Sequence, residues 1–202
     1  MLQGVKLNIA VLGSTKGTDL QVILESKFIN NLKIVISNKK DAFILERTKK
    51  YNIKTLFLNP EGKTREEYDE ELHNLFNEYK IDIVLLIGYM KLLSKNLVNS
   101  WKIFNIHPSL LPAFAGGMNL NVHQAVLDRG CKITGCSLIL VDEGADTGPI
   151  IIQKTIKVDK GDTVSLLKDK VQKIEQEALI EFLELYQTRK ISIIDGKVDI
   201  NE

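Results

Sequence analysis

The stretch Leu7–Asp19 reads LNIAVLGSTKGTD, and it passes from an apolar run through a glycine-containing turn toward a helical pattern. The run Leu7–Leu12 is short, rich in aliphatic residues and ends at a glycine, which predicts a buried β-strand. The window Asp19–Phe28 has the spacing of an α-helix. We therefore expect the chain to open with a strand, a tight loop and a helix.

The first half of the chain repeats this alternation of strand and helix. Further strands are predicted at Lys33–Ile36, Thr55–Leu58 and Ile83–Ile87, and further helices at Ala42–Tyr51 and Arg65–Tyr79. Strands that alternate with helices form parallel sheets with right-handed crossovers. The pattern therefore predicts an α/β fold with a doubly wound, mostly parallel, Rossmann-like sheet, in which ligands bind beyond the carboxyl ends of the strands.

The second half has longer strand-like runs and one long helix. Ile133–Val141 and Ile150–Lys157 are expected to add antiparallel strands to the sheet. Asp162 and Thr163 offer N-cap chemistry for a helix that continues to about Thr188. The end of the chain, Ile191–Ile200, predicts a hairpin that turns at Asp195-Gly196. We expect one domain over residues 1–202.

Composition excludes several classes of protein. The net charge is +1, so no global electrostatic attraction to nucleic acid or to an anionic membrane is expected. No apolar run is long enough to span a bilayer, and the N-terminus lacks a signal pattern. The two cysteines, Cys131 and Cys136, do not have the spacing of a zinc site. These features indicate a cytoplasmic protein with no metal.

Three loops that contain candidate functional residues follow predicted strands: Gly13–Asp19, Gly88–Leu92 and Asn105–Pro112. The first has glycines that can turn backbone amides toward an anion at the start of a helix. It matches neither a Walker loop nor a dinucleotide fingerprint. The amides of Gly17–Asp19 and the Thr18 hydroxyl are the candidates for holding a phosphate, although a plain tight turn explains the same spacing.

Two further groups of residues are candidates for chemistry. Asn105 and His107 are two residues apart, so both side chains project from one face of a strand. Asp146 lies in an acidic, glycine-containing loop, where an aspartate can also serve only to form the turn. Gln172 and Glu175 share one face of the long helix, where a solvated face is the simpler interpretation.

The segments NIHPSLLP at Asn105–Pro112 and DTGPI at Asp146–Ile150 closely resemble the folate-dependent formyltransferase family. The resemblance covers nearly the whole chain. It implies transfer of a formyl group from 10-formyltetrahydrofolate to the amine of glycinamide ribonucleotide in de novo purine biosynthesis. It also implies that Asn105, His107 and Asp146 are catalytic, that Asp146 favours the imidazolium form of His107, and that a water relays protons.

The resemblance extends to two binding regions, and it implies that the N-terminal half binds the phosphate-bearing substrate and the C-terminal half binds folate. It implies that the substrate phosphate binds to Gly17, Thr18 and Asp19 with help from Gln172, and that Glu175 contacts the ribose or glycinamide portion. The residues that it implies for folate are Arg65, Met90, Lys91, Leu92 and Val141.

Three features of this chain differ from common members of the family. Asp19 replaces a usual asparagine, and we expect its carboxylate to point away from the phosphate or to cap the helix. Lys91 replaces a frequent arginine, so the charge stays but the bidentate fork is lost. The segment Gly116–His123 is longer than in common members.

Other functions remain as alternatives. A 10-formyltetrahydrofolate hydrolase is expected to carry an additional N-terminal domain, and a methionyl-tRNA formyltransferase a C-terminal RNA-binding domain and a basic surface. A non-catalytic sugar-phosphate binding module would not need the three catalytic candidates together. We expect small-molecule substrates, no nucleic-acid or membrane partner, and a monomer or homodimer.

Overall fold

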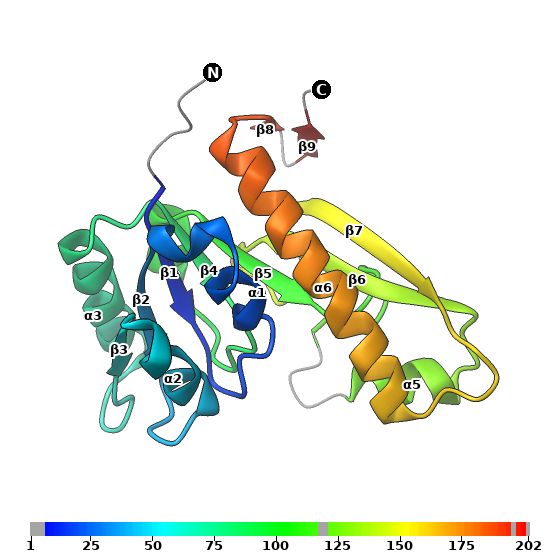
Figure 1. Cartoon of the computed structure of the whole chain (residues 1–202). Coiled ribbons are helices and arrows are strands. Elements are labelled where there is room, and N and C mark those ends of the chain that lie inside the picture. Colours follow the sequence, from blue (N-terminus) through cyan, green and yellow to red (C-terminus); the bar gives the residue numbers. More distant parts are fainter. Residues whose placement is uncertain (1–6, 117–120, 195–196, 201–202) are drawn as a thin grey trace. The chain divides into compact units, whose positions relative to one another are not determined.

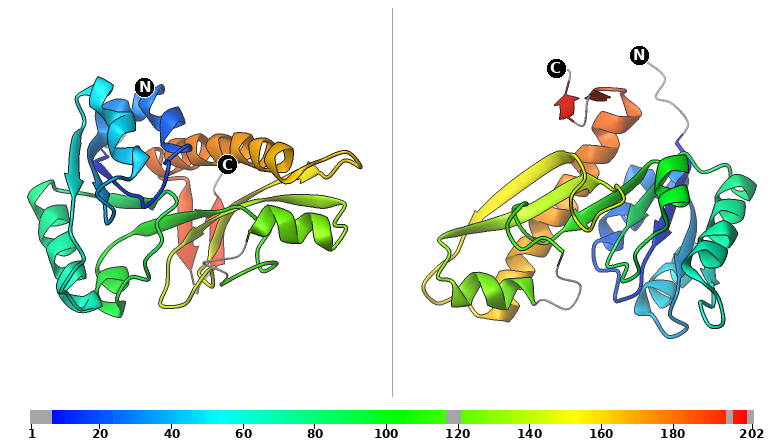
Figure 2. Two further views of the ribbon diagram at one scale, coloured as in Figure 1. Left: turned by 90° about the horizontal axis from the view of Figure 1, so that it is seen from below. Right: turned by 180° about the vertical axis from the view of Figure 1, so that it is seen from behind.

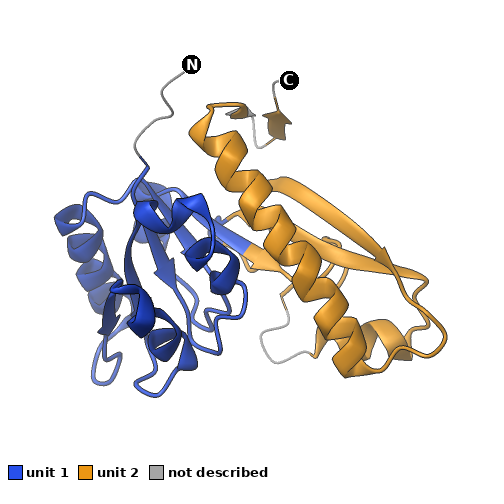
Figure 3. Cartoon of the chain, viewed as in Figure 1, with its two compact units in different colours: residues 1–105, 141–143 blue, residues 106–140, 144–202 orange. Residues whose placement is uncertain are grey.

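A computed structural model describes residues 7–116, 121–194 and 197–200. The chain forms two compact units, residues 1–105 with 141–143 and residues 106–140 with 144–202 (Figure 3). A single domain over the whole chain stays a prediction. Among the helices of the described ranges, none combines the length and the apolar character needed to cross a lipid bilayer.

Unit 1 is built on parallel strands. They are β1 (Ile9–Leu12), β2 (Leu32–Ser37), β3 (Lys54–Phe57), β4 (Ile83–Leu86) and β5 (Ile103–His107), the last of which ends beyond the unit boundary (Figure 1). The full strand order is β3-β2-β1-β4-β5-β6-β7. Strand β1 pairs in parallel with both β2 and β4, so the sheet is wound in two directions from its centre. This confirms the predicted α/β fold.

Both faces of this sheet are covered. One face packs into a cluster that includes Ala10 and Leu12 of β1 together with Tyr68, Leu72 and Phe76 of helix α3 (Arg65–Glu78). These three α3 residues are four apart, so they form one stripe of the helix. Helix α3 begins at a capping box, in which Thr64 and Glu67 satisfy each other's backbone amides. Burial on both sides explains the continuous apolar runs of the strands.

The first two predicted helices are shorter than expected. Helix α1 spans Leu20–Leu24, and a 3₁₀ turn at Lys27–Asn31 follows it. Ser26 causes the break, because its hydroxyl donates to the Ile23 carbonyl and accepts from the Phe28 amide. Helix α2 spans Phe43–Thr48 and passes into a second 3₁₀ turn at Lys49–Tyr51.

One helix was not predicted. Helix α4 (Lys95–Ser100) begins at Ser94, whose hydroxyl accepts from the Leu97 amide. The Ser94 amide in turn donates to Asp69 of α3, and burial raises the pKa of the Asp69 carboxyl. The start of this short helix is therefore fixed by a side chain distant in sequence.

Unit 2 contains an antiparallel pair and the long helix. Its elements are α5 (Val122–Asp128), β6 (Ile133–Leu140), β7 (Ile150–Lys157), α6 (Val164–Gln187), β8 (Ile191–Ile194) and β9 (Lys197–Ile200). Strands β6 and β7 are antiparallel, as predicted, and α6 lies along both of them (Figures 1 and 2). Strands β8 and β9 pair as the expected hairpin, whose turn at residues 195–196 lies outside the described residues.

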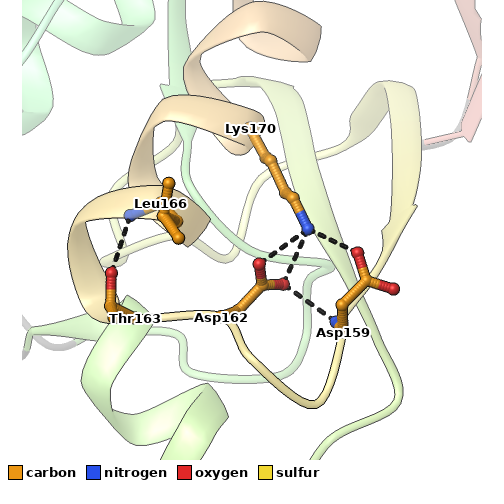
Figure 4. Close-up of polar contacts among 5 residues, drawn as sticks. All are labelled: Asp159, Asp162, Thr163, Leu166 and Lys170. Atoms are coloured by element: carbon orange, nitrogen blue, oxygen red, sulfur yellow. Dashed lines mark hydrogen bonds and ion pairs between the residues drawn. The ribbon is translucent and has the colours of Figure 1, made fainter.

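The start of α6 is fixed by polar side chains (Figure 4). The Leu166 amide donates to the Thr163 hydroxyl at 3.3 Å, which confirms Thr163 as the N-cap. The Lys170 ammonium donates to Asp159 at 2.7 Å and to both carboxylate oxygens of Asp162 at 2.7 and 2.8 Å. These contacts lower the pKa of Asp162 and join the incoming loop to the second turn of the helix.

Replacing Thr163 with alanine is expected to lower the free energy of unfolding by about 1 kcal/mol, because the Leu166 amide loses its partner. Urea denaturation followed by circular dichroism measures this value. Ser165→Ala is the matched control, since Ser165 is exposed in the first turn of the same helix. Alanine favours the helix there, so the control should be equal to or slightly more stable than the wild type. Equal stability of T163A and the wild type would contradict the assigned cap.

Candidate active site

The loop after β1 turns at Gly17, where the backbone has a φ of +59°. A Cβ at this position would lie 2.3 Å from the Cγ1 of Ile44, so only glycine fits both the backbone conformation and the space. The carbonyls of Gly17 and Thr18 accept from the amides of Leu20 and Gln21. The amides of Gly17–Asp19 therefore belong to the entry into α1, as the predicted anion loop requires.

Ser14 joins the loops that follow three neighbouring strands. Its hydroxyl donates to the Asn38 side chain at 2.6 Å and accepts from the Met90 amide at 2.8 Å. Its own amide donates to the Gly88 carbonyl at 3.0 Å. The anion loop and the predicted Gly88–Leu92 loop are thus in contact. No spacing in the sequence indicated this role for Ser14.

A pocket of about 570 Å³ lies beside the anion loop. Residues that line it include Lys16, Lys39 and Lys40, with Asp41 as the acidic residue of the group. Three ammonium groups around one opening favour an anionic ligand. Lys39 and Lys40 were not predicted as site residues, because Lys16, on the other side of the pocket, belongs to a loop distant in sequence.

Arg47 supports one wall of this pocket. Its guanidinium lies 5.4 Å from the ring centre of Phe43, which is exposed, and its Nε donates to the Lys16 carbonyl at 3.2 Å. The anion loop is therefore fixed from α2 by an ionic side chain that also covers an aromatic ring.

Asp19 occupies the N-cap position of α1, but its side chain makes no capping hydrogen bond. Of the two alternatives expected for this carboxylate, capping of the helix is therefore wrong, and an orientation away from the phosphate stays a prediction. Its backbone is already in the helical region, at φ −74° and ψ −17°, whereas a capping side chain usually projects from an extended residue.

His107 and Asp146 meet within unit 2. His107 Nδ1 lies 3.4 Å from Asp146 Oδ2, and the side chains are 9% and 17% exposed. The Gly116 amide donates to the same carboxylate oxygen at 3.1 Å. Asp146 has a φ of +59°, a conformation that aspartate tolerates better than most residues. The acidic, glycine-containing loop around Asp146 therefore directs this carboxylate toward the imidazole of His107.

The charge state of His107 is set by opposing effects. Burial lowers the pKa of His107 and outweighs Asp146 and a hydrogen bond with the Phe114 backbone, which both raise it. Asp146 therefore favours the imidazolium, as expected, but burial has the larger effect, so the pKa of His107 is lowered and the neutral ring is favoured in the free protein. With Nδ1 facing the carboxylate, Nε2 is the nitrogen left over, and it has no hydrogen-bond partner among the described residues.

Asn105 lies on β5 two residues before His107 and is half-buried. Its neighbour across the parallel pair is Leu86 of β4. Both residues therefore lie in strand β5, and the shared face of their side chains stays a prediction.

The residues implied for folate are located in unit 1. Met90 and Leu92 are exposed apolar side chains, at 38% and 45%. The Lys91 ammonium lies 5.1 Å from the ring centre of Tyr68. Arg65 is the first residue of α3, and the Val141 amide donates to the Ile103 carbonyl at 2.8 Å.

Gln172 and Glu175 lie on α6 in unit 2. Glu175 is 5% exposed and Gln172 is half-buried. The interpretation of this face as simply solvated is therefore wrong. The segment Gly116–His123 cannot be compared with the family, because residues 117–120 lie outside the described residues. Within the described ranges, no three His, Cys, Asp or Glu side chains are grouped so that they could hold a metal ion.

The fold agrees with comparisons to known proteins. The sequence profile described as formyl transferase matches residues 7–183, and the chain belongs to this family. The chain is 38% identical to phosphoribosylglycinamide formyltransferase of Escherichia coli (strain K12) over 82% of its own length and 80% of that protein. The crystal structure of glycinamide ribonucleotide transformylase 1 from Symbiobacterium toebii superposes with a TM-score of 0.92, at 33% identity, over 100% of this chain and 98% of that one.

Other relatives are much longer. The trifunctional purine biosynthetic protein adenosine-3 of Bos taurus is 38% identical over 91% of this chain, which corresponds to 19% of that protein. The chain therefore spans about a fifth of the length of these relatives.

Replacing Asp146 with asparagine is expected to lower the pKa of His107 further, because the carboxylate that raises it is lost while burial remains. NMR titration of the His107 ring protons measures this change. The matched control is Glu143→Gln, in the same loop but paired with Lys95 at 2.9 Å. An unchanged or higher His107 pKa in D146N would contradict the assigned contact.

Proposed function

We propose that the chain transfers a formyl group from 10-formyltetrahydrofolate to the amine of glycinamide ribonucleotide, a step of de novo purine biosynthesis. Relatives named phosphoribosylglycinamide formyltransferase support the proposal, since the match includes most of both chains. The observation that carries it is the contact of His107 Nδ1 with Asp146 at 3.4 Å, which leaves Nε2 for proton transfer.

In this proposal His107 begins the reaction as the neutral imidazole that its lowered pKa favours. The substrate amine attacks the formyl carbon, a new C–N bond forms, and the carbonyl electron pair moves to oxygen. Nε2 takes the proton that the amine loses, and Asp146 stabilises the resulting imidazolium. The protonated ring then donates a hydrogen bond to the oxyanion and keeps its proton for the leaving nitrogen.

Asn105 acts as the second oxyanion donor through its side-chain amide. Preorganised donors of this kind contribute roughly 3–4 kcal/mol each to transition-state stabilisation. Collapse of the intermediate breaks the bond between the formyl carbon and the folate nitrogen, which takes a proton from the imidazolium through a water held by Asp146. Neither step requires a metal.

The phosphate of the substrate is assigned to the amides of Gly17, Thr18 and Asp19. The lysine-lined pocket beside them supports this assignment, because Lys39 and Lys40 add positive charge to that of Lys16. Gln172 assists in binding the phosphate, and Glu175 contacts the ribose or glycinamide portion.

The folate co-substrate is assigned to the Arg65, Met90, Lys91, Leu92 and Val141 group. The exposure of Met90 and Leu92 supports this, because apolar side chains left at the surface can cover a flat aromatic ring. We also propose that the protein is cytoplasmic and acts as a monomer or homodimer. Its partners in this proposal are small-molecule substrates, with no nucleic acid and no membrane.

The assay that tests this function offers 10-formyltetrahydrofolate with glycinamide ribonucleotide, water or charged tRNA as the acceptor. Formyl transfer to the ribonucleotide is expected. Transfer to water or to charged tRNA instead would identify a hydrolase or a tRNA formyltransferase, and no turnover would favour a binding module.

His107→Ala and D146N are expected to lower kcat by about a hundredfold or more, because each removes a group that handles the reacting protons. KM for the ribonucleotide should change little, since its phosphate is assigned elsewhere. Steady-state kinetics test this, with Glu143→Gln as the control. Near-normal turnover in both variants would overturn the catalytic assignment.

Lys39→Ala and Lys40→Ala are expected to raise KM for the ribonucleotide about fivefold each, the effect of losing about 1 kcal/mol of charge attraction. The difference should shrink as salt is added. Lys54→Ala is the control, because Lys54 is an exposed lysine at the beginning of β3, away from the carboxyl end where the loops lie. A KM equal to that of the control would remove both lysines from the phosphate site.

A further inference from the structure

The segment Ser109–Gly116 follows His107 and contributes two backbone groups to the site. The Phe114 backbone forms a hydrogen bond with His107, and the Gly116 amide donates to Asp146 at 3.1 Å. The position of this segment therefore decides how both catalytic candidates are oriented.

Bonds inside the segment stiffen it without fixing it to the sheet. The Ser109 hydroxyl donates to the Ala113 carbonyl at 2.6 Å, and the Ala113 amide donates to the Leu110 carbonyl at 3.0 Å. Leu110 also lies close to β6, because a Cβ at Gly135 would be 2.8 Å from its Cδ2. Apolar contact alone does not fix the direction of peptide groups, so polar anchors are needed.

Two side chains of the β6–β7 pair provide these anchors. The Ser137 hydroxyl donates to the Ser109 carbonyl at 2.8 Å and accepts from the Leu111 amide at 3.0 Å. The Gln153 amide nitrogen donates to the Leu111 carbonyl at 3.0 Å and to the Ser137 hydroxyl at 2.9 Å. Ser137 and Gln153 are also direct partners across the two strands.

The hydrogen-bonding capacity of both groups is fully used. A serine hydroxyl has one proton and two lone pairs, and Ser137 uses all three. The glutamine NH₂ has two protons, and one goes to each acceptor. A glutamate at position 153 would place an acceptor oxygen, in place of the NH₂ donor, against the Leu111 carbonyl and the Ser137 hydroxyl. A methionine has a similar size but no hydrogen-bond donor.

We propose that Gln153, together with Ser137, is a positioning residue that holds the Ser109–Gly116 segment and thereby orients His107 and Asp146 for formyl transfer; this role rests on the proposed function. Gln153 does not touch the reacting atoms. It acts through its hydrogen bond with the Leu111 carbonyl and through the Ser137 hydroxyl, which binds both the Ser109 carbonyl and the Leu111 amide.

Gln153 is the better residue to test, because it is exposed whereas Ser137 is fully buried. Gln153→Met keeps the size of the side chain and removes both donors without opening the core. Thr155→Ala is the matched control, since Thr155 is exposed two residues further along the same strand. Thermal unfolding of both variants establishes that each is folded.

The expected result for Gln153→Met is a loss of about tenfold or more in kcat, with KM for the sugar phosphate close to the wild-type value, because small displacements of catalytic groups reduce rate more than binding. The pKa of His107, followed by NMR, should fall as the Phe114 bond that raises it weakens. T155A should match the wild type in both measurements.

The NMR readout separates this inference from the function on which it rests. If the wild type shows no formyl transfer, the proposed function fails, while the His107 titration still tests whether Gln153 positions the ring. A wild-type His107 pKa, or a raised one, in Gln153→Met overturns the inference. An unchanged kcat in that variant also overturns it and leaves the proposed function standing.

Discussion

The pairing of β1 between β2 and β4 is the constraint on which the rest of unit 1 depends. All four residues of β1 are fully buried, so this strand cannot move to an edge without exposing apolar surface on both faces. Chain direction then brings the loops after β1, β2 and β4 to one edge of the sheet. The Ser14 hydroxyl forms hydrogen bonds with the loops after β2 and β4, so one side chain holds the three loops together.

In unit 2 the balance between burial and charge decides the chemistry that His107 can perform. A carboxylate beside an imidazole favours the cation, and the structure contains that pair. Burial nevertheless has the larger effect and lowers the pKa of His107. An imidazole that rests neutral beside a carboxylate can accept a proton and then be stabilised as a donor, so a single group can serve both stages of an addition and elimination.

The predictions that succeeded came from local patterns. The strand β1, the antiparallel pair β6 and β7, and the Thr163 cap of α6 each follow from residues close together in the sequence. The meeting of His107 with Asp146 was implied by family resemblance, because spacing alone left Asp146 as a turn former. The failures involve contacts or solvation that no local pattern encodes. Ser26 interrupts a helical pattern, Asp69 fixes the unpredicted α4, and the charge state of His107 depends on how completely neighbours exclude water.

The close approach of Ile44 to Gly17 gives the anion loop a dependence that reaches beyond its own residues. The sec-butyl side chain of Ile44 on α2 occupies the volume in which a larger loop residue would have to sit. Shrinking Ile44 to alanine would remove the contacts of its outer carbons but leave its Cβ 2.8 Å from the added atom, and the left-handed backbone would stay unfavourable for any residue with a Cβ. Substitutions at these two positions are consequently not equivalent. Ile44 can become smaller while Gly17 is retained, whereas no substitution at position 44 compensates for a larger residue at position 17.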